Sequence, residues 1–167
     1  MDLNNPLLTR ISTSAFTNER VSQEKITKVL RAGMAAPSAG NQQPWEFYVT
    51  QNRGIIEKLA RSNPNAAWAK SAGTAILLAW DKDRLIYPEF SLIDMACCAE
   101  NIMIEANSEG LGSVFLSLAP VQERMDNVKV QLELPENIEP FALIPLGYAA
   151  KKQDVKDFYN KERIHKL

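Results

Sequence analysis

The segment from Ala36 to Trp45 is dense in residues that could hydrogen-bond to a ligand. It contains two prolines, one glycine and four polar side chains in the order Ala-Pro-Ser-Ala-Gly-Asn-Gln-Gln-Pro-Trp. Pro37 fixes its own φ and Pro44 favours an extended conformation at Gln43, so the loop between the prolines is stiff. Rigid polar groups lose little entropy on binding, so the loop suits a flat ligand rich in heteroatoms. An ordinary polar connection between a helix and a strand is the alternative interpretation.

A second polar segment, Thr9 to Phe16, places one arginine among several hydroxyl side chains. The guanidinium of Arg10 is always charged and its planar fork matches the oxygens of a phosphate, while Ser12 can donate a further hydrogen bond. The segment therefore indicates a phosphate site. A solvated N-terminal turn has a similar composition and remains the alternative.

The other reactive residues form no pattern that could catalyse a reaction without a cofactor. His165 is the only histidine and lies near the C-terminus, and the adjacent Cys97 and Cys98 are the only cysteines. Because both cysteines lie in an apolar helical stretch, we interpret them as buried core residues, and two thiols with one histidine do not make a zinc site. Five acids are interpreted as helix-surface or capping groups: Glu19, Glu24, Asp94, Glu100 and Glu105. An enzyme of this composition would need a cofactor to supply its reactivity.

The hydrophobic pattern predicts helices alternating with about four strands. The first clear helix follows Ser22, a plausible N-cap, and Pro145 within the last strand indicates an edge position or a bulge. No Gly-x-Gly-x-x-Gly sequence opens a helix, so the fingerprint of a dinucleotide-binding fold is missing. The predicted elements are helices over 23–35, 55–62, 91–108 and from Pro120 onward, and strands over 45–50, 74–80, 113–118 and 141–146.

The predicted helix from Ser91 to Ser108 carries apolar residues nearly all round. Ser91 and Asp94 have the spacing of a capping box, and Gly110 supplies a stop signal. A helix that is apolar on most sides is buried, so we expect it at the middle of a domain or in a subunit interface.

The composition is that of a soluble globular protein. The 167 residues are 46% apolar and 23% charged, which fits a single domain with a real core. A formal net charge of −1 gives no electrostatic footprint for nucleic acid. The longest apolar run, Ala75 to Trp80, is far too short to span a membrane. The N-terminus shows no secretory signal, so the cytoplasm is the expected location.

The segment 36–45 closely resembles the signature loop of the FMN-dependent nitroreductase family, which lies against the flavin ring. The N-terminal segment resembles the family motif Arg-Arg-Ser-x-Arg-x-Phe, which holds the FMN phosphate and ribityl chain, and it matches at Arg10, Ser12 and Phe16. Ile11 and Ser14 replace two basic residues of that motif. Each lost charge-assisted bond would weaken FMN binding by roughly 1.5–3 kcal/mol without compensation, although Ser14 can still form a neutral bond.

The resemblance implies further cofactor contacts. Near the C-terminus, Arg163 loosely fits a family position whose basic side chain reaches the phosphate. The stretch from Asp94 to Ser117 resembles the family's interface helix and the turn that follows it, matching at Asn101, Gly110, Leu111 and Gly112. A backbone N–H near Leu116 or Ser117 would support the flavin ring. The remaining implied contacts are Pro37, Ser38, Ala39 and Asn41 to the ring and, more faintly, Asn65 to the ribityl chain.

The resemblance also implies the architecture and the activity. It implies an α+β nitroreductase-like fold with a mainly antiparallel central sheet flanked by helices, formed by residues 1–167 as one domain. It further implies a homodimer with two FMN sites at the interface, where residues 148–167 pack on the partner. NADH or NADPH would reduce the flavin, which would pass electrons to a nitroaromatic or quinone in a ping-pong cycle. The alternatives are an FMN-binding carrier or sensor without turnover, and a specialised flavin enzyme such as a reductive dehalogenase.

Overall fold

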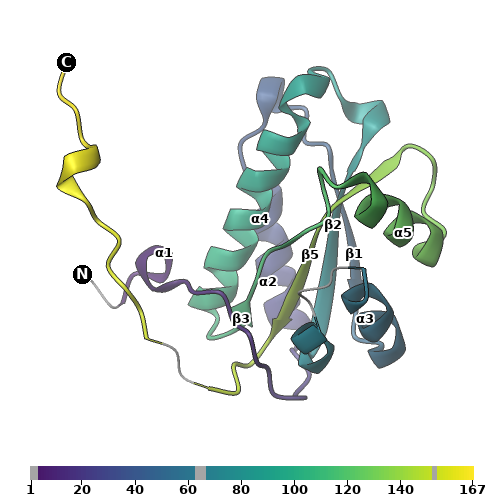
Figure 1. Cartoon of the computed structure of the whole chain (residues 1–167), viewed down its shortest axis with the longest axis horizontal. Helices are drawn as coiled ribbons and strands as arrows, with labels where there is room; N and C mark the ends of the chain where they lie inside the picture. The colour runs from purple at the N-terminus through teal and green to yellow at the C-terminus, as the bar shows by residue number, and fades with distance from the viewer. Residues whose placement is uncertain (1–3, 63–66, 152–153) are drawn as a thin grey trace.

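The chain folds around one antiparallel sheet. The computed structural model describes residues 4–62, 67–151 and 154–167. The sheet has the strand order β1-β2-β5-β3, with β4 also paired to β5, and every one of these strand pairs is antiparallel (Figure 1). The strands are β1 (Trp45–Thr50), β2 (Thr74–Asp81), β3 (Gly112–Ser113), β4 (Leu116–Ser117) and β5 (Ile138–Gly147).

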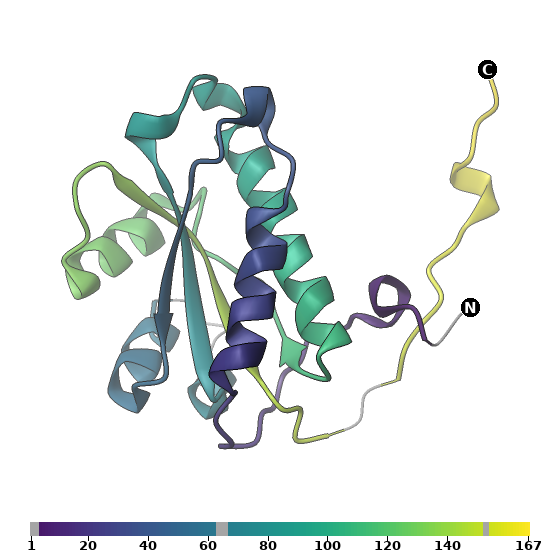
Figure 2. The same cartoon turned by 180° about the vertical axis from the view of Figure 1, so that it is seen from behind.

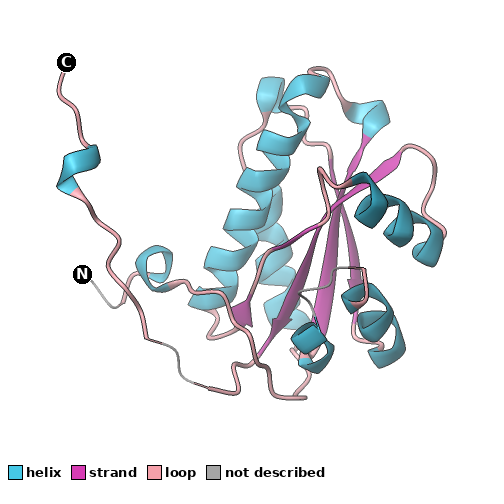
Figure 3. Cartoon of the chain, in the orientation of Figure 1, coloured by secondary structure: helices cyan, strands magenta, loops and turns pink. Residues whose placement is uncertain are grey.

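Helices cover both faces of this sheet. Helices α2 and α4 lie side by side on one face, and α3 and α5 lie on the other (Figures 2 and 3). The arrangement confirms the expected α+β fold. The helices are α1 (Pro6–Thr9), α2 (Gln23–Met34), α3 (Arg53–Ala60), α4 (Ser91–Ser108) and α5 (Gln122–Leu132), with 3-10 turns at Ala39–Asn41, Ala67–Ser71, Lys82–Arg84, Pro88–Phe90 and Lys161–Arg163.

Local signals set the ends of the two long helices, and a glycine sets their spacing. The Ser22 side chain accepts a hydrogen bond from the Lys25 N–H and caps α2, as predicted. After α4, Gly110 adopts a φ of 72°, a left-handed conformation that glycine reaches without steric cost. Where the helices pack, a Cβ on Gly33 would lie 2.9 Å from Ile102 Cγ1, so the absence of a side chain lets α2 approach α4 closely.

The prediction that Pro145 marks an edge or a bulge was wrong. It lies in β5, which is central between β2 and the short strands β3 and β4, and its partner across the β2 pair is Ala75. The predicted strand over 113–118 is divided into β3 and β4. These two strands pair with β5 on either side of residues 144 and 145, which have no strand partner on that side. A residue that lacks an N–H is tolerated there because no strand hydrogen bond is needed. The shift in register between β2 and β5 lies elsewhere, between Leu78 and Ala79.

Helix α4 is only half covered within one chain. Cys98 is buried as predicted, and burial raises the pKa of its thiol to about 12, but Cys97 is half-buried. Leu92 is 39% exposed and Ile93 is 59% exposed, on the side of α4 turned away from the sheet. Among the residues that the structure describes, no helix has the length and apolar character needed to cross a lipid bilayer.

Gly73 allows the N-terminal segment to pass directly over the start of β2. A Cβ at this position would lie 2.1 Å from the carbonyl oxygen of Glu19, which is a backbone atom with little freedom to move. We expect Gly73→Ala to lower the free energy of unfolding by about 1–3 kcal/mol, because the overpacked backbone must shift. Thermal unfolding followed by circular dichroism would show a melting temperature lower by about 2–4 °C per kcal/mol.

Gly54→Ala is the matched control for this prediction. Gly54 lies in α3, where the nearest atom to a new Cβ is Asn52 Oδ1 at 3.4 Å, an ordinary contact. The control should melt at the wild-type temperature or slightly above it, because alanine favours the helix. Equal melting temperatures for Gly73→Ala and the wild type would contradict the predicted clash.

Candidate functional site

The first part of the candidate site is the proline loop, which we define as residues 36–44. It connects α2 to β1 and lies over the N-terminal end of α4 (Figure 2). The Ala39 N–H donates to Asp94 Oδ1 at 2.9 Å, and the Gln42 side-chain amide donates to Asp94 Oδ2 at 2.6 Å. The interpretation of Asp94 as a helix-surface or capping residue was wrong, because its side chain is buried and holds the loop. Likewise, α4 begins without a side-chain cap from Ser91.

The proline loop is tightly folded and still presents polar groups outward. Gly40, Asn41 and Gln43 have φ values of 55°, 56° and 46°, which are left-handed conformations. The Ser38 hydroxyl accepts from the Gln43 N–H at 3.0 Å, and Asn41 Oδ1 accepts from the Gln43 side-chain amide at 3.1 Å. Pro37 and Asn41 are exposed, whereas Ser38 and Ala39 are half-buried. The residues that the sequence assigns to the flavin ring are therefore grouped on one short, rigid loop.

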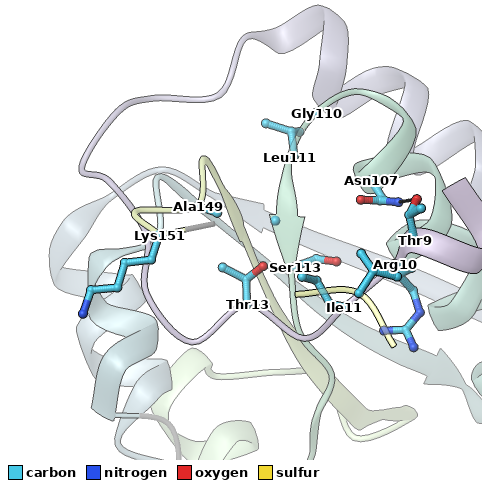
Figure 4. Close-up of a pocket in the computed structure, with 12 residues that line it drawn as sticks. Thr9, Arg10, Ile11, Thr13, Asn107, Gly110, Leu111, Ser113, Ala149 and Lys151 are labelled. Carbon is cyan, nitrogen blue, oxygen red and sulfur yellow. Dashed lines mark hydrogen bonds between the residues drawn. The ribbon is translucent and has the colours of Figure 1, made fainter. Parts of the chain in front are cut away.

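The second part of the site is a cavity of about 470 Å³ beside Arg10, which we term the arginine cavity. Arg10 Nε donates to Glu100 Oε1 at 3.0 Å, so this acid is a partner of Arg10 and not the plain surface group that was predicted. Within the described residues, the terminal guanidinium nitrogens of Arg10 form no hydrogen bond and no ion pair. Figure 4 shows the cavity walls, which are Thr9, Arg10, Ile11, Thr13, Asn107, Gly110, Leu111, Gly112, Ser113, Ala149, Lys151 and Val155.

Ser12 and Ser14 lie on the extended segment that passes the arginine cavity, but this segment lines the cavity through Arg10, Ile11 and Thr13. The Thr13 N–H donates to the Ser113 carbonyl at 2.9 Å, and Ser12 forms a bridge to the same residue of β3. Thr13 is buried, while Ser12 and Ser14 are exposed. Side chains alternate along an extended chain, so Ser12 and Ser14 point to the side opposite Thr13, which lines the cavity. The cavity wall of one chain therefore holds Arg10 and Thr13, while the exposed Ser12 and Ser14 lie outside the wall.

The wall of this cavity does not include Leu116 and Ser117, which were predicted to contact FMN, or Asn101, which matches the family pattern. Leu116 and Ser117 form β4, which follows directly after the cavity wall at β3. Leu116 is buried and Ser117 is half-buried. Asn101 donates to the Ala32 carbonyl at 3.0 Å and thereby joins α4 to α2. Asn65 lies outside the residues that the structure describes.

The C-terminal tail runs away from the body of its own chain. Figures 1 and 2 show it passing α1 and then forming the short turn that contains Arg163, far from the sheet. A second cavity of about 360 Å³ lies between α1 and the tail, where Phe158 and Tyr159 form part of the wall. These two aromatic residues are 83% and 74% exposed, and Arg163 is also exposed. The tail therefore does not bring Arg163 to the arginine cavity of its own chain.

One chain also keeps the proline loop and the arginine cavity apart. The loop contacts α4 at Asp94, whereas Arg10 contacts α4 at Glu100. Six residues of helix correspond to a rise of ~9 Å and to a different side of the helix. Farther along α4, Asn107 donates to the Pro6 carbonyl and fixes α1 near the helix's C-terminal end. The two parts of the site thus lie toward opposite ends of α4.

Sequence reasoning missed three residues that shape the site. Gln42 and Asp94 hold the proline loop, and Lys151 adds a second cation to the arginine cavity. Asp94 did carry a signal, because an acid within an apolar run requires a buried hydrogen-bonding partner. Nothing in the sequence identified that partner. In the described part of the chain, no group of His, Cys, Asp or Glu residues is arranged to hold a metal ion.

Comparison with known proteins assigns the chain to a family. The sequence model of the nitroreductase family matches residues 7–63 and 59–148. A candidate NADH oxidase from Clostridium acetobutylicum is 41% identical, with a TM-score of 0.93 over 96% of this chain and 97% of that one. A candidate NADH dehydrogenase/NAD(P)H nitroreductase from Methanothermobacter thermautotrophicus is 34% identical over 99% of this chain and 86% of its own length. The chain belongs to the nitroreductase family.

A more distant structure shares the fold. A candidate nitroreductase from Desulfovibrio desulfuricans, solved in complex with FMN, is 23% identical and has a TM-score of 0.83. It covers 100% of this chain, and the match includes 98% of that structure. The architecture is therefore kept at low sequence identity.

Proposed function

We propose that this protein is an FMN-dependent oxidoreductase that takes electrons from NADH or NADPH. With FMN as the carrier, these electrons would reach a small acceptor, such as a nitroaromatic or a quinone, in a ping-pong cycle. The observation that carries the proposal is the arginine cavity, where Arg10 lines a hollow of about 470 Å³ in a chain of the nitroreductase family. The curated relative named for NAD(P)H supports the choice of reductant.

The donor set of the arginine cavity fits a phosphate. Glu100 occupies the Nε edge of Arg10, which leaves the terminal nitrogens to face an anion. The wall residues Thr13 and Lys151 add a hydroxyl and a second positive charge. Ser12 and Ser14, which are exposed outside the wall, would add neutral donors from the same segment. Charge-assisted hydrogen bonds to phosphate are among the strongest that side chains make. This cation on the wall compensates in part for Ile11, which is neutral where the family motif is basic.

The proline loop fits the flat ring of the same cofactor. FMN supplies the redox chemistry when bound, accepting a hydride and returning electrons to a second substrate. The loop residues Pro37, Ser38, Ala39 and Asn41 would hold the ring, and the backbone at Leu116 or Ser117 would donate to it. In this account no side chain acts as an acid or a base. The chain binds, orients and shields the cofactor, and both substrates use one open slot in turn.

The complete site requires two copies of the chain. Leu92 and Ile93 leave an apolar strip on α4 that is uncovered in one chain. If two copies pack along the length of α4 about a two-fold axis perpendicular to this helix, their α4 helices run antiparallel. Because the proline loop and the arginine cavity lie at opposite ends of α4, this packing brings the loop of one copy toward the cavity of the other. Residues 148–167 would then pack on the partner and carry Arg163 toward the partner's phosphate site.

Absorption spectroscopy and turnover assays test this proposal together. Protein purified with added FMN should keep a flavin spectrum after gel filtration, and it should oxidise NADH or NADPH when a nitroaromatic or quinone is added. A flavin spectrum without turnover would instead indicate a carrier or sensor. Faster turnover with a halogenated aromatic would indicate a reductive dehalogenase. Protein that retains no FMN would contradict the proposal.

A further inference from the structure

We propose that Asp94 and Gln42 are positioning residues for the cofactor site, acting together as a hydrogen-bonded relay that fixes the proline loop. The part of the inference that concerns the cofactor rests on the function proposed above. The relay itself is a property of the chain alone, so it can be tested without any cofactor. Neither residue is exposed at the surface that a ligand would meet, since Gln42 is 7% exposed and Asp94 is 3% exposed.

The relay connects three separate segments. Asp94, in the first turns of α4, accepts from the Ala39 N–H and from the Gln42 amide. On its other side, Gln42 Oε1 accepts from the backbone N–H groups of Ile86 and Tyr87 at 2.8 and 2.9 Å. Its amide nitrogen also donates to the Tyr87 carbonyl at 3.3 Å. The proline loop is therefore tied both to α4 and to the segment that precedes it.

The direction of each bond in the relay is determined by the backbone. Two N–H groups point at one end of the Gln42 side chain, so that end must be the oxygen and the other end must be the NH₂ group. The NH₂ group in turn requires an acceptor, which Asp94 Oδ2 provides. Asp94 Oδ1 accepts from a backbone N–H, so this aspartate acts as an acceptor at both oxygens. The relay therefore admits only one arrangement of donors and acceptors.

The loop needs this support because its backbone is strained. Asn41 and Gln43 have φ values of 56° and 46°, and residues other than glycine seldom adopt this region. Such conformations persist only where the surroundings determine them, and they concentrate at functional sites. Gly40 makes a related contact, since a Cβ there would lie 2.6 Å from Cε2 of the Tyr87 ring. The relay thus holds in place the residues assigned to the flavin ring.

Exchanging the carboxylate and the amide between positions 94 and 42 tests the relay. A general loss of stability would not be reversed when the two substitutions are combined. In Asp94→Asn, an NH₂ group must face either the Ala39 N–H or the Gln42 NH₂ group, so two donors meet. In Gln42→Glu, two carboxylates meet across the 2.6 Å contact. The double variant Asp94→Asn with Gln42→Glu restores one donor opposite one acceptor at every bond of the relay except the longer one to the Tyr87 carbonyl. It also keeps the net charge of the pair.

The matched control is the same exchange on the exposed surface of α5. Gln122 Nε2 donates to Asp126 Oδ1 at 2.8 Å, and both side chains are exposed. The control double variant is Gln122→Glu with Asp126→Asn. It changes the same chemical groups away from the proline loop, and it should leave every measurement below at the wild-type value.

The first measurement is amide hydrogen exchange of the cofactor-free protein, followed by mass spectrometry of peptides that cover residues 38–44. Each single variant should exchange faster in these peptides by roughly 10- to 100-fold, which corresponds to the loss of a hydrogen bond to a charged group. The double variant should return to within about threefold of the wild type, because the donors and acceptors match again. Wild-type exchange in both single variants, or no recovery in the double variant, would overturn the relay.

The second measurement is the FMN affinity of the same variants. Both single variants should bind FMN at least tenfold more weakly than the wild type, and the double variant should recover most of the affinity. If exchange follows the predicted pattern but all variants bind FMN equally, the relay does not position the cofactor site and that part of the inference is wrong. If the wild type does not bind FMN at all, the proposed function fails, and the exchange measurement still decides whether the relay exists.

Discussion

Replacing Arg10 with alanine is expected to weaken FMN binding by roughly 10- to 100-fold, because the phosphate would lose at least one charge-assisted hydrogen bond. The substitution should hardly affect the fold, since the Arg10 side chain is only partly buried and its ion pair with Glu100 is partly exposed. Titration of cofactor-free protein with FMN, followed by the quenching of flavin fluorescence, gives the dissociation constant directly.

Arg84→Ala is the control for the Arg10 prediction. Arg84 is also a partly exposed arginine in ion pairs, with Glu46 at 2.9 Å and Asp81 at 3.5 Å, but it does not line the arginine cavity. Its replacement should leave the FMN dissociation constant unchanged. If the Arg10→Ala protein bound FMN as tightly as the wild type, the phosphate would have to lie somewhere other than the arginine cavity.

Replacing Ile93 with glutamate is expected to separate the two subunits and to abolish FMN binding at micromolar protein concentration. Ile93 is 59% exposed in one chain, on the apolar strip of α4 that we assign to the interface. A charge there would be buried without a partner on both subunits, because a two-fold axis presents each substitution to the same interface twice. Sedimentation velocity measures the oligomeric state, and the fluorescence titration measures FMN.

Val130→Glu is the matched control for the interface. Val130 lies on α5 and is 78% exposed, on the side of the sheet opposite to α4. The control should remain dimeric and bind FMN normally. A wild-type protein that sediments as a monomer would contradict the proposed interface. A monomeric Ile93→Glu protein with wild-type FMN affinity would show that one chain completes the site by itself.

The parts of the fold that the sequence predicted are those with local signals. Ser22 as a cap of α2 and Gly110 as the end of α4 depend on residues next to each other in the chain, and the structure confirms both. The β2 strand was predicted from a run of apolar residues that must be buried on both faces. The two prolines that frame the proline loop likewise indicated a stiff, non-helical segment before β1.

The parts that could not be predicted depend on contacts between distant segments. Asp94 and Glu100 have the appearance of ordinary helix residues until the proline loop and Arg10 are brought to them, across 52 and 90 positions of the sequence. Pro145 is tolerated in a central strand because β3 and β4 leave a gap opposite it, whereas the sequence predicted one continuous strand over 113–118. The signature residues gave the chemistry of the site, but its division between the two ends of α4 required the fold.

The central claim is that bound FMN carries electrons between two substrates that use one slot in turn. Its most direct test is an anaerobic stopped-flow experiment on the FMN-loaded protein. Mixing with NADH or NADPH should bleach the flavin band, and after removal of the nucleotide, mixing with a quinone or nitroaromatic should restore it. A flavin band that neither nucleotide bleaches would contradict the account, as would reduced flavin that only transfers electrons while the nucleotide remains bound.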